Sequence, residues 1–329
     1  MNGPDDARAR AWRPSAPLAT LRLRAQLLAA TRGFFAERGV LEVDTPALVR
    51  HAVTDVHIHS AQVQLPGHAA LWYLHSSPEY AMKRLLAAGS GDIYQIAHVF
   101  RGEELSGLHN AEFTLIEWYR CGYSLLRLMQ EVAQLAALLL DLPPVPSVES
   151  VSYSQAFMRE LGCEPLSASD EVLRALAVAH RLDARAAAAC ARDELLDWLV
   201  GSVLGPRLGA QGLCFLHHYP ASQAALARLD PADRRVALRF ELYYRGVELA
   251  NGFEELADAA EQRARFDADR QQRLQHGLPT PEIDSALLAA LAAGLPPSAG
   301  VALGFDRLLM LRTGARDLSE VLPFALERA

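Results

Sequence analysis

Residues 93–121 constrain the fold most strongly, because they predict two long strands joined by a polar loop. An apolar run precedes the loop, and the segment after it reads EFTLIEWY, which is rich in β-branched and aromatic residues. Side chains alternate between the two faces of a strand. Four residues of the second strand should therefore share one face: Phe113, Leu115, Glu117 and Tyr119. A ring, a carboxylate and a phenol together predict the floor of a binding site. The alternative is an amphipathic hairpin whose polar residues face water.

The composition describes a globular chain of 329 residues with a formal net charge of -7. That charge argues against a broad nucleic-acid footprint, which depends on lysine and arginine neutralising phosphates. The four cysteines are far apart and form no CxxC pair. We therefore expect no disulfide framework, and a reducing cytoplasm suits the chain. The sequence contains no apolar run long enough to span a membrane.

The order of the segments predicts one large domain over residues 18–329, preceded by a flexible arm over residues 1–17. Residues 18–38 have helical spacing and precede a short strand that ends at Pro46. Residues 151–210 are rich in alanine and contain no catalytic constellation. We interpret them as a helical insertion.

Two short polar segments admit two interpretations each. Ser77-Pro78-Glu79 begins a helix, where Glu79 either complements the helix dipole or receives an ammonium group. Asp55, His57 and His59 alternate as they would on a strand. That spacing suits either a metal site or, as we favour, a wet sheet face.

Residues 235–256 predict two strands around a tight turn at Arg245-Gly246. A two-residue turn places Tyr243 opposite Glu248, with Glu241 diagonal to Glu248 and about 7–8 Å away. Two like carboxylates at that separation suit a divalent cation, and Mg²⁺ prefers one or two carboxylates together with substrate phosphates. The alternative is a pair of solvated glutamates on an edge hairpin.

Near the end of the chain, Gly300 to Leu311 predicts a strand that leads into a helix. Small residues on the strand would let a flat ligand lie against the backbone. Arg307, in the first helical turn, could then reach a phosphate.

Three pieces in fixed order carry a family resemblance: the strand ending at Pro46, the Phe100-Arg101-x-Glu103 hairpin, and Gly304-Phe305-Asp306-Arg307. They resemble the three motifs of class II aminoacyl-tRNA synthetases. Ser77-Pro78-Glu79, HNAEFTLIEWY and ELANGFEEL are most similar to the lysine-specific catalytic domain. The resemblance covers roughly residues 20–329. It implies an α+β fold with an antiparallel sheet of six or seven strands flanked by helices, and a homodimer formed through the first motif.

The first motif begins within about forty residues of the start of this sequence, so we expect no anticodon-binding domain. The chain therefore resembles the synthetase-like ligases that attach (R)-β-lysine to a lysine of elongation factor P, without tRNA. Ala302 stands where the synthetase pattern has the middle glycine of GxGxG, and its methyl group could favour a displaced amine. Two alternatives are a lysine-activating paralogue with another product and a non-catalytic regulatory protein that binds an amino acid.

The resemblance also implies roles for individual residues, with ATP and Mg²⁺ as cofactors. Arg101 would hold the α-phosphate and the substrate carboxylate, and Glu248 and Arg307 would join it as catalytic residues. The ATP-binding residues would be Arg101, Glu103, His109, Asn110, Phe113, Glu248, Leu249, Gly304 and Arg307. Glu241 and Glu248 would hold magnesium. The amino acid would bind Ser77, Pro78, Glu79, Tyr119, Asn251 and Glu255. The loop before His109 lacks the family's usual arginine, and Ala111 replaces a common proline.

Overall fold

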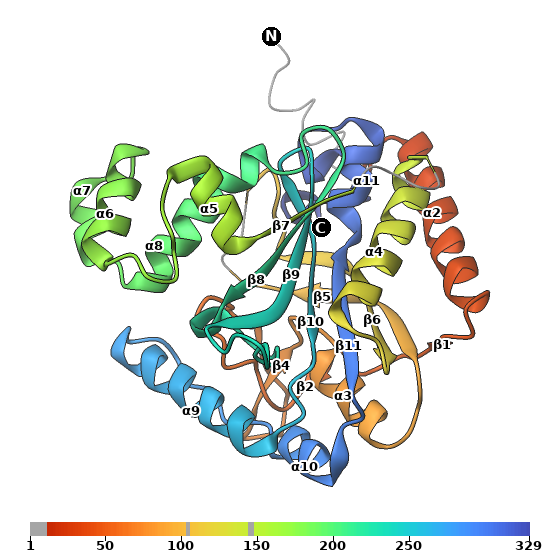
Figure 1. Ribbon diagram of the computed structural model, residues 1–329. Helices are drawn as coiled ribbons and strands as arrows, with labels where there is room; N and C mark the ends of the chain where they lie inside the picture. Colours follow the sequence, from red (N-terminus) through yellow and green to blue (C-terminus); the bar gives the residue numbers. More distant parts are fainter. Residues whose placement is uncertain (1–11, 103–105, 144–147) are drawn as a thin grey trace.

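A mixed eight-stranded sheet forms the centre of the computed structural model, which describes residues 12–102, 106–143 and 148–329 (Figure 1). Six central strands pair antiparallel, while β1 and β7 pair in parallel with β5 and β8 at the two edges. The predicted α+β class is confirmed, but the sheet has eight strands and parallel edges. In spatial order the strands are β1 (Leu41–Glu42), β5 (Ile93–Phe100), β6 (Glu112–Cys121), β11 (Ser298–Gly304), β10 (Val247–Glu254), β9 (Val236–Tyr244), β8 (Leu213–Pro220) and β7 (Val148–Ser152).

Three helices cover one face of the sheet and enclose the main core: α2 (Leu18–Ala36), α4 (Leu125–Leu140) and α11 (Phe305–Thr313). The helix α4 begins where the Ser124 hydroxyl accepts a hydrogen bond from the backbone N–H of Arg127. Trp118 of β6 is fully buried against Phe35, with ring centroids 5.3 Å apart. This packing leaves the opposite face of β6, β11 and β10 available for a ligand.

A second group of helices closes the lower end of the sheet in Figure 1: α3 (Glu79–Ala87), α9 (Ala259–Gln275) and α10 (Ser285–Gly294). Met82 of α3, Phe266 of α9 and Leu287 of α10 share one core cluster. A small sheet lies nearby in the chain, with β4 (Leu71–Leu74) between β2 (Leu48–Val49) and β3 (Gln62–Gln64). The predicted helices near residues 18–38 and 79–88 are thus confirmed.

The region predicted as a helical insertion contains four α-helices: α5 (Tyr153–Leu161), α6 (Asp170–Ala179), α7 (Ala184–Ala189) and α8 (Arg192–Leu199). Short π and 3-10 turns continue α8 as far as Arg207. These helices bury a core of their own against β8 and form a lobe beside the main sheet in Figure 1. The division of the chain into an arm and one catalytic domain stays a prediction.

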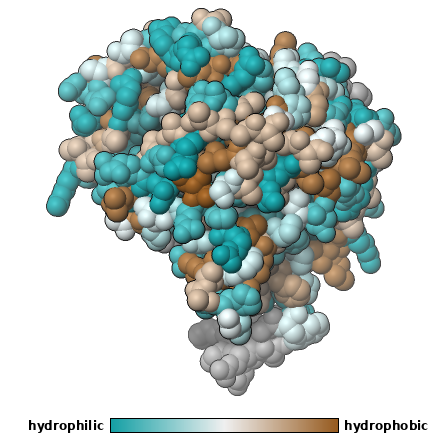
Figure 2. Space-filling model, turned by 90° about the horizontal axis from the view of Figure 1, so that it is seen from below, coloured by the Kyte–Doolittle hydropathy of each residue, from teal (hydrophilic) through white to brown (hydrophobic). Residues whose placement is uncertain are grey.

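The described part of the N-terminal arm packs against the end of the chain. Ser15 and Ala16 donate backbone hydrogen bonds to Pro323 and Leu322, at 2.8 and 3.1 Å. On the face drawn in Figure 2, hydrophobic residues form separate patches among hydrophilic ones. Among the described residues, every helix is too short or too polar to cross a bilayer.

Candidate active site

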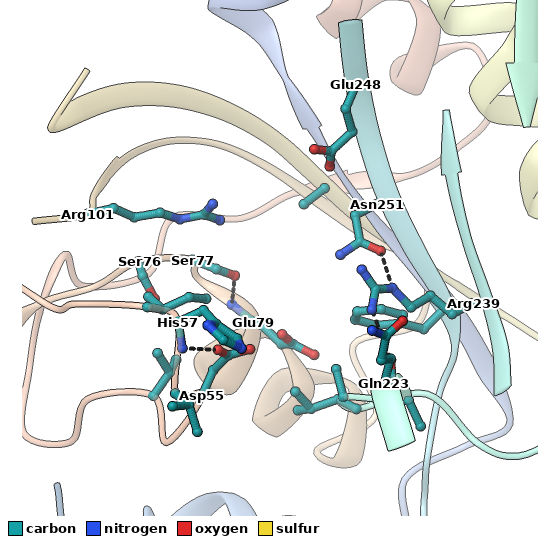
Figure 3. A pocket seen from close by; sticks show the side chains of 18 of the residues that line it. Asp55, His57, Ser76, Ser77, Glu79, Arg101, Gln223, Arg239, Glu248 and Asn251 are labelled. Carbon is teal, nitrogen blue, oxygen red and sulfur yellow. Dashed lines mark hydrogen bonds between the residues drawn. The ribbon is translucent and has the colours of Figure 1, made fainter. Parts of the chain in front are cut away.

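A cavity of about 1070 Å³ lies over the open face of β6, β11 and β10 (Figure 3). The four residues expected to share a face, Phe113, Leu115, Glu117 and Tyr119, all line it, so the floor predicted from strand alternation is confirmed as a cavity wall. The helices α3, α8, α9 and α11 contribute further walls, together with residues 53–58 and 221–226. A volume of this size suits a ligand as large as a nucleotide joined to an amino acid.

The strand register places four side chains in one row across the sheet, and the first three of them line the cavity. Glu117 of β6 pairs with Ala302 of β11, which pairs with Asn251 of β10, which pairs with Glu241 of β9. Side chains directly opposite one another in antiparallel strands lie on the same face. The Ala302 methyl group therefore lies between a carboxylate and an amide on the cavity floor.

Arg101 follows the end of β5, and its guanidinium points into the cavity (Figure 3). Glu248 lies on one side of it in that view, with Ser77 and Glu79 on the other. A backbone hydrogen bond to Ala111, 2.9 Å long, holds Arg101 at the mouth of the hairpin. Its Nε atom is buried without a hydrogen-bond partner. A buried donor of this kind is suited to a carboxylate or phosphate ligand.

Arg307 organises the end of the cavity expected to bind ATP. Its Nε atom donates to the carbonyl oxygen of Leu108 at 3.1 Å, and Nη1 donates to that of Glu248 at 3.1 Å. Its Nη2 atom lies 2.6 Å from Nε2 of His109. These contacts join the loop after β5 to the start of α11. His109, Leu249, Gly304 and Phe113 line the same cavity.

Two predicted ATP-binding residues stand apart from this group. The Asn110 side chain donates to the carbonyl oxygen of Glu112 at 2.7 Å and accepts from the N–H of Leu326 at 3.3 Å. It lines the cavity but also ties the loop to the end of the chain. Glu103 lies outside the described residues.

The preceding residue, Asp306, fixes the start of α11 and therefore the position of Arg307. Its carboxylate accepts from the backbone N–H of Thr114 at 2.6 Å and pairs with the Arg24 guanidinium. Asp306 is 2% exposed. A buried carboxylate held by two donors anchors the start of α11 to β6 and α2.

The predicted amino-acid residues line the rest of the cavity, except Pro78, which faces a separate pocket. The Ser77 hydroxyl donates to Oε2 of Glu117 at 2.7 Å and accepts from the N–H of Glu79 at 3.0 Å. The hydroxyl of Tyr119 donates to Oε1 of Glu117 at 2.8 Å. The N-cap of α3 is Pro78, one residue after the serine that sequence preferences favour there, and the helix begins at Glu79 as predicted. Glu255, just beyond β10, completes this acidic group.

Burial dominates the electrostatics of this acidic group. It raises the pKa of Glu117 to about 8, with the Glu79 charge adding to the shift and hydrogen bonds from Ser77 and Tyr119 opposing it. Burial also raises the pKa of Glu255 to about 7, although the Lys83 ammonium opposes that shift. Such carboxylates favour a cationic ligand that would replace their protons.

The two predicted magnesium ligands lie near each other, as the hairpin register required. Tyr243 pairs with Glu248 as predicted, and a bulge follows at Leu249. Burial, and then the Glu241 charge, raise the pKa of Glu248. Glu241 accepts from Arg239 and from the Tyr243 hydroxyl, each at 2.6 Å, and each carboxylate oxygen keeps a second lone pair. No cluster of three metal-ligating side chains occurs in the described ranges. The pair fits a magnesium ion whose remaining ligands are phosphate oxygens and water.

Three residues that build the site were not singled out as binding residues from the sequence. Glu117 was placed on the correct face but assigned no ligand. Arg239 donates to Oδ1 of Asn251 at 3.2 Å and to the carbonyl oxygen of Gln223 at 2.9 Å. Lys83 contacts both Glu79 and Glu255. A usable signal existed for Lys83, because it is the only lysine among the 32 lysines and arginines.

The interpretation of residues 55–59 as a strand was wrong. They form a turn, in which Oδ1 of Asp55 accepts from the backbone N–H of His57 at 2.8 Å. Asp55 and His57 face the cavity from the wall opposite Asn251 and Arg239 in Figure 3. A local hydrogen bond from aspartate to its own backbone favours a turn over a strand.

Comparison with known proteins adds a second line of argument to this geometry. A family model described as tRNA synthetases class II (D, K and N) matches residues 6–328. Three similar proteins, each named elongation factor P–(R)-β-lysine ligase, come from Edwardsiella ictaluri (strain 93-146), Photorhabdus laumondii subsp. laumondii and Salmonella typhi. They are 51%, 50% and 49% identical to this chain over 322 residues, which cover 97% of this chain and 98% of each relative.

Proposed function

This chain belongs to the class II tRNA synthetase family, and from that premise we propose that it activates (R)-β-lysine with ATP and transfers it to a lysine ε-amine of elongation factor P. The observation that carries the proposal is the composition of the cavity. Among its lining residues, the Arg101 guanidinium and the three carboxylates of Glu79, Glu117 and Glu255 share the part expected to bind the amino acid. That arrangement complements an amino acid with one carboxylate and two ammonium groups.

In the first step, Arg101 holds the substrate carboxylate against the α-phosphate. The carboxylate oxygen attacks the α-phosphorus, and pyrophosphate leaves. The transition state gains charge on the phosphoryl oxygens, which a preorganised guanidinium stabilises. Arg307 and His109 bind the outer phosphates, and Phe113 lies under the adenine. A magnesium ion held by Glu241 and Glu248 would supply further charge neutralisation there.

In the second step, a neutral ε-amine of the partner protein attacks the carbonyl carbon of the mixed anhydride. An amide bond forms, AMP leaves with the bonding electron pair, and the amine loses a proton. The buried floor, which includes Leu115 and Leu249, excludes water that would otherwise hydrolyse the anhydride.

Ala302 supports the choice of β-lysine over α-lysine. Its methyl group occupies the row between Glu117 and Asn251, where an α-amine would otherwise lie closest to the floor. An amine displaced by one carbon avoids that methyl group.

We also propose a cytoplasmic homodimer that acts without tRNA. All four cysteines are free, which suits a reducing compartment. Leu41, in the strand of the first motif, is 55% exposed, and this strand lies at the edge of the sheet, where a second subunit could cover it.

ATP–pyrophosphate exchange tests the proposal directly. We expect exchange with (R)-β-lysine to exceed exchange with α-lysine, and no exchange without an amino acid. Adding elongation factor P should then increase the mass of that protein by one β-lysyl group. Exchange with α-lysine alone, without a mass increase, would contradict the proposal. Glu248→Gln should abolish exchange while leaving amino-acid binding detectable by calorimetry.

A further inference from the structure

Lys83 is the only lysine in the chain. The other 31 of its 32 lysines and arginines are arginines. Lys83 lies in the middle of α3 and is 1% exposed. It does not line the cavity but lies behind the carboxylates that do. A buried lysine in a chain that otherwise uses arginine indicates a position where a compact ammonium group is needed.

The Lys83 ammonium contacts two carboxylates at the same short distance. Nζ donates to Oε1 of Glu79 at 2.6 Å and lies 2.6 Å from Oε2 of Glu255. Glu79 lies one helical turn before Lys83, so α3 itself sets that pair. Glu255 reaches the same ammonium from the end of β10. Lys83 therefore fixes the separation of two carboxylates that belong to different elements.

Lys83 also sets the charge of the pocket. The three carboxylates Glu79, Glu117 and Glu255 carry three negative charges when ionised, and Lys83 cancels one of them. The hydroxyls of Tyr119 and Tyr80 beside them are held neutral because burial raises their pKa values well above the usual range, and Asp55 and Asp269 line the same cavity farther along it. Two negative charges remain, which equals the number of ammonium groups on lysine or β-lysine.

Without a counter-ion, buried carboxylates take up protons. Burial already raises the pKa of Glu117 to about 8 and that of Glu255 to about 7. Coulombic attraction and hydrogen bonds from Glu255 and Glu79 outweigh burial and raise the pKa of Lys83. Lys83 therefore stays charged throughout the range in which its neighbours titrate. Removing it would add bound protons that an ammonium ligand has to displace.

We propose that Lys83 is a positioning residue that holds Glu79 and Glu255 at a fixed separation and neutralises one of the three acidic charges, so that the empty pocket matches a substrate with two ammonium groups. This inference rests on the proposed function, because it concerns the site assigned there to the amino acid. It predicts that Lys83 acts on amino-acid binding and on the pH dependence of that binding, while leaving ATP binding unchanged.

The test compares Lys83→Met with Arg84→Met, which introduces the same residue and removes one positive charge at the next, exposed position of α3. Calorimetry gives the Kd of (R)-β-lysine, and separately of ATP, for both variants and the wild type. At neutral pH, Lys83→Met should raise the Kd of β-lysine by about tenfold or more, the factor that one pKa unit represents. The Kd should recover most of this loss at about pH 8.5, where the carboxylates ionise again. Arg84→Met should change neither Kd.

Two results would overturn the inference. One is an unchanged β-lysine Kd in folded Lys83→Met. The other is an equal loss of β-lysine and ATP binding that does not recover at higher pH, which indicates a structural role only. Failure of the wild type to bind any diammonium amino acid would instead refute the proposed function.

A measurement on the wild type keeps the inference testable if Lys83→Met does not fold. Binding of β-lysine in buffers of different ionisation enthalpy reports the protons released. We expect release at about pH 7 and little release at about pH 9, because Glu117 and Glu255 are then already ionised. Equal release at both values would contradict the charge match.

Discussion

Replacing Gly300 with alanine should damage the amino-acid end of the site more than any other single methyl addition in β11. A Cβ atom at this position would lie 2.3 Å from Cε1 of Tyr119 and 2.5 Å from Oε1 of Glu255. Carbon atoms in contact normally lie about 3.5–4.0 Å apart, so the neighbours must move by about 1 Å.

Neither of the two side chains that this Cβ atom would contact, Tyr119 and Glu255, has room to move. Tyr119 is 3% exposed, and its hydroxyl donates to Glu117 at 2.8 Å. The Glu255 side chain is 1% exposed and lies 2.6 Å from the Lys83 ammonium. Overpacking of this kind costs about 1–3 kcal/mol of unfolding free energy. A misplacement of about 1 Å in a site can cost up to about 100-fold in rate, so we expect the KM of the amino acid to rise by about tenfold to 100-fold.

Urea unfolding and ATP–pyrophosphate exchange measure the two effects of Gly300→Ala. The KM of ATP should change by less than about threefold, because the clash lies outside the nucleotide end. Gly304→Ala is the control for stability. Its Cβ atom would lie 3.7 Å from the nearest atom, so the unfolding free energy should stay constant or rise by about 0.4–1 kcal/mol. Unchanged stability and an unchanged amino-acid KM in Gly300→Ala would refute the reasoning.

Three further predictions concern single side chains. Because burial raises the pKa of Glu117 from 4.5 to about 8, the empty folded protein binds more protons than the unfolded chain between these values, and its stability falls as pH rises through them. Glu117→Gln should reduce that decline, as measured by urea unfolding at about pH 6 and 8.5; an identical slope in the variant would argue against the shift. Arg307→Lys should raise the KM of ATP by about tenfold or more and leave the amino-acid KM unchanged, as measured by exchange kinetics. The reason is that an ammonium group cannot reproduce the contacts to Leu108, Glu248 and His109. Ala302→Gly should lower the ratio of kcat/KM for β-lysine over α-lysine by about tenfold, and a constant ratio would remove Ala302 as a determinant.

Short-range patterns predicted the centre of the site well. The period of two in residues 112–119 placed four side chains on the cavity wall, and the two-residue turn placed Tyr243 opposite Glu248. Both predictions depend on residues within one hairpin, where the chain itself fixes the register.

Contacts between distant segments were not predictable in the same way. The sequence marks Lys83 only as the single lysine, and its contact with Glu255 becomes visible only when the two segments are placed side by side. The helix α8 reaches the site through Asp197, which accepts from Gln223 at 2.9 Å, while Gln223 accepts from Arg239. The parallel edges β1 and β7 are likewise set by tertiary packing, since strands of two and five residues carry little pattern of their own.

The presence of a single, buried lysine affects how readily the enzyme would acylate its own side chains. An acyl adenylate modifies any neutral amine that it meets, so an enzyme that makes one risks acylating its own side chains. The only ε-amine in this chain is buried, protonated and held by two carboxylates. Arginine side chains, which replace lysine everywhere else, remain charged and are poor nucleophiles. The single lysine of this protein is thereby protected from acylation, and an acceptor lysine on a partner protein would meet no competing lysine on the enzyme surface.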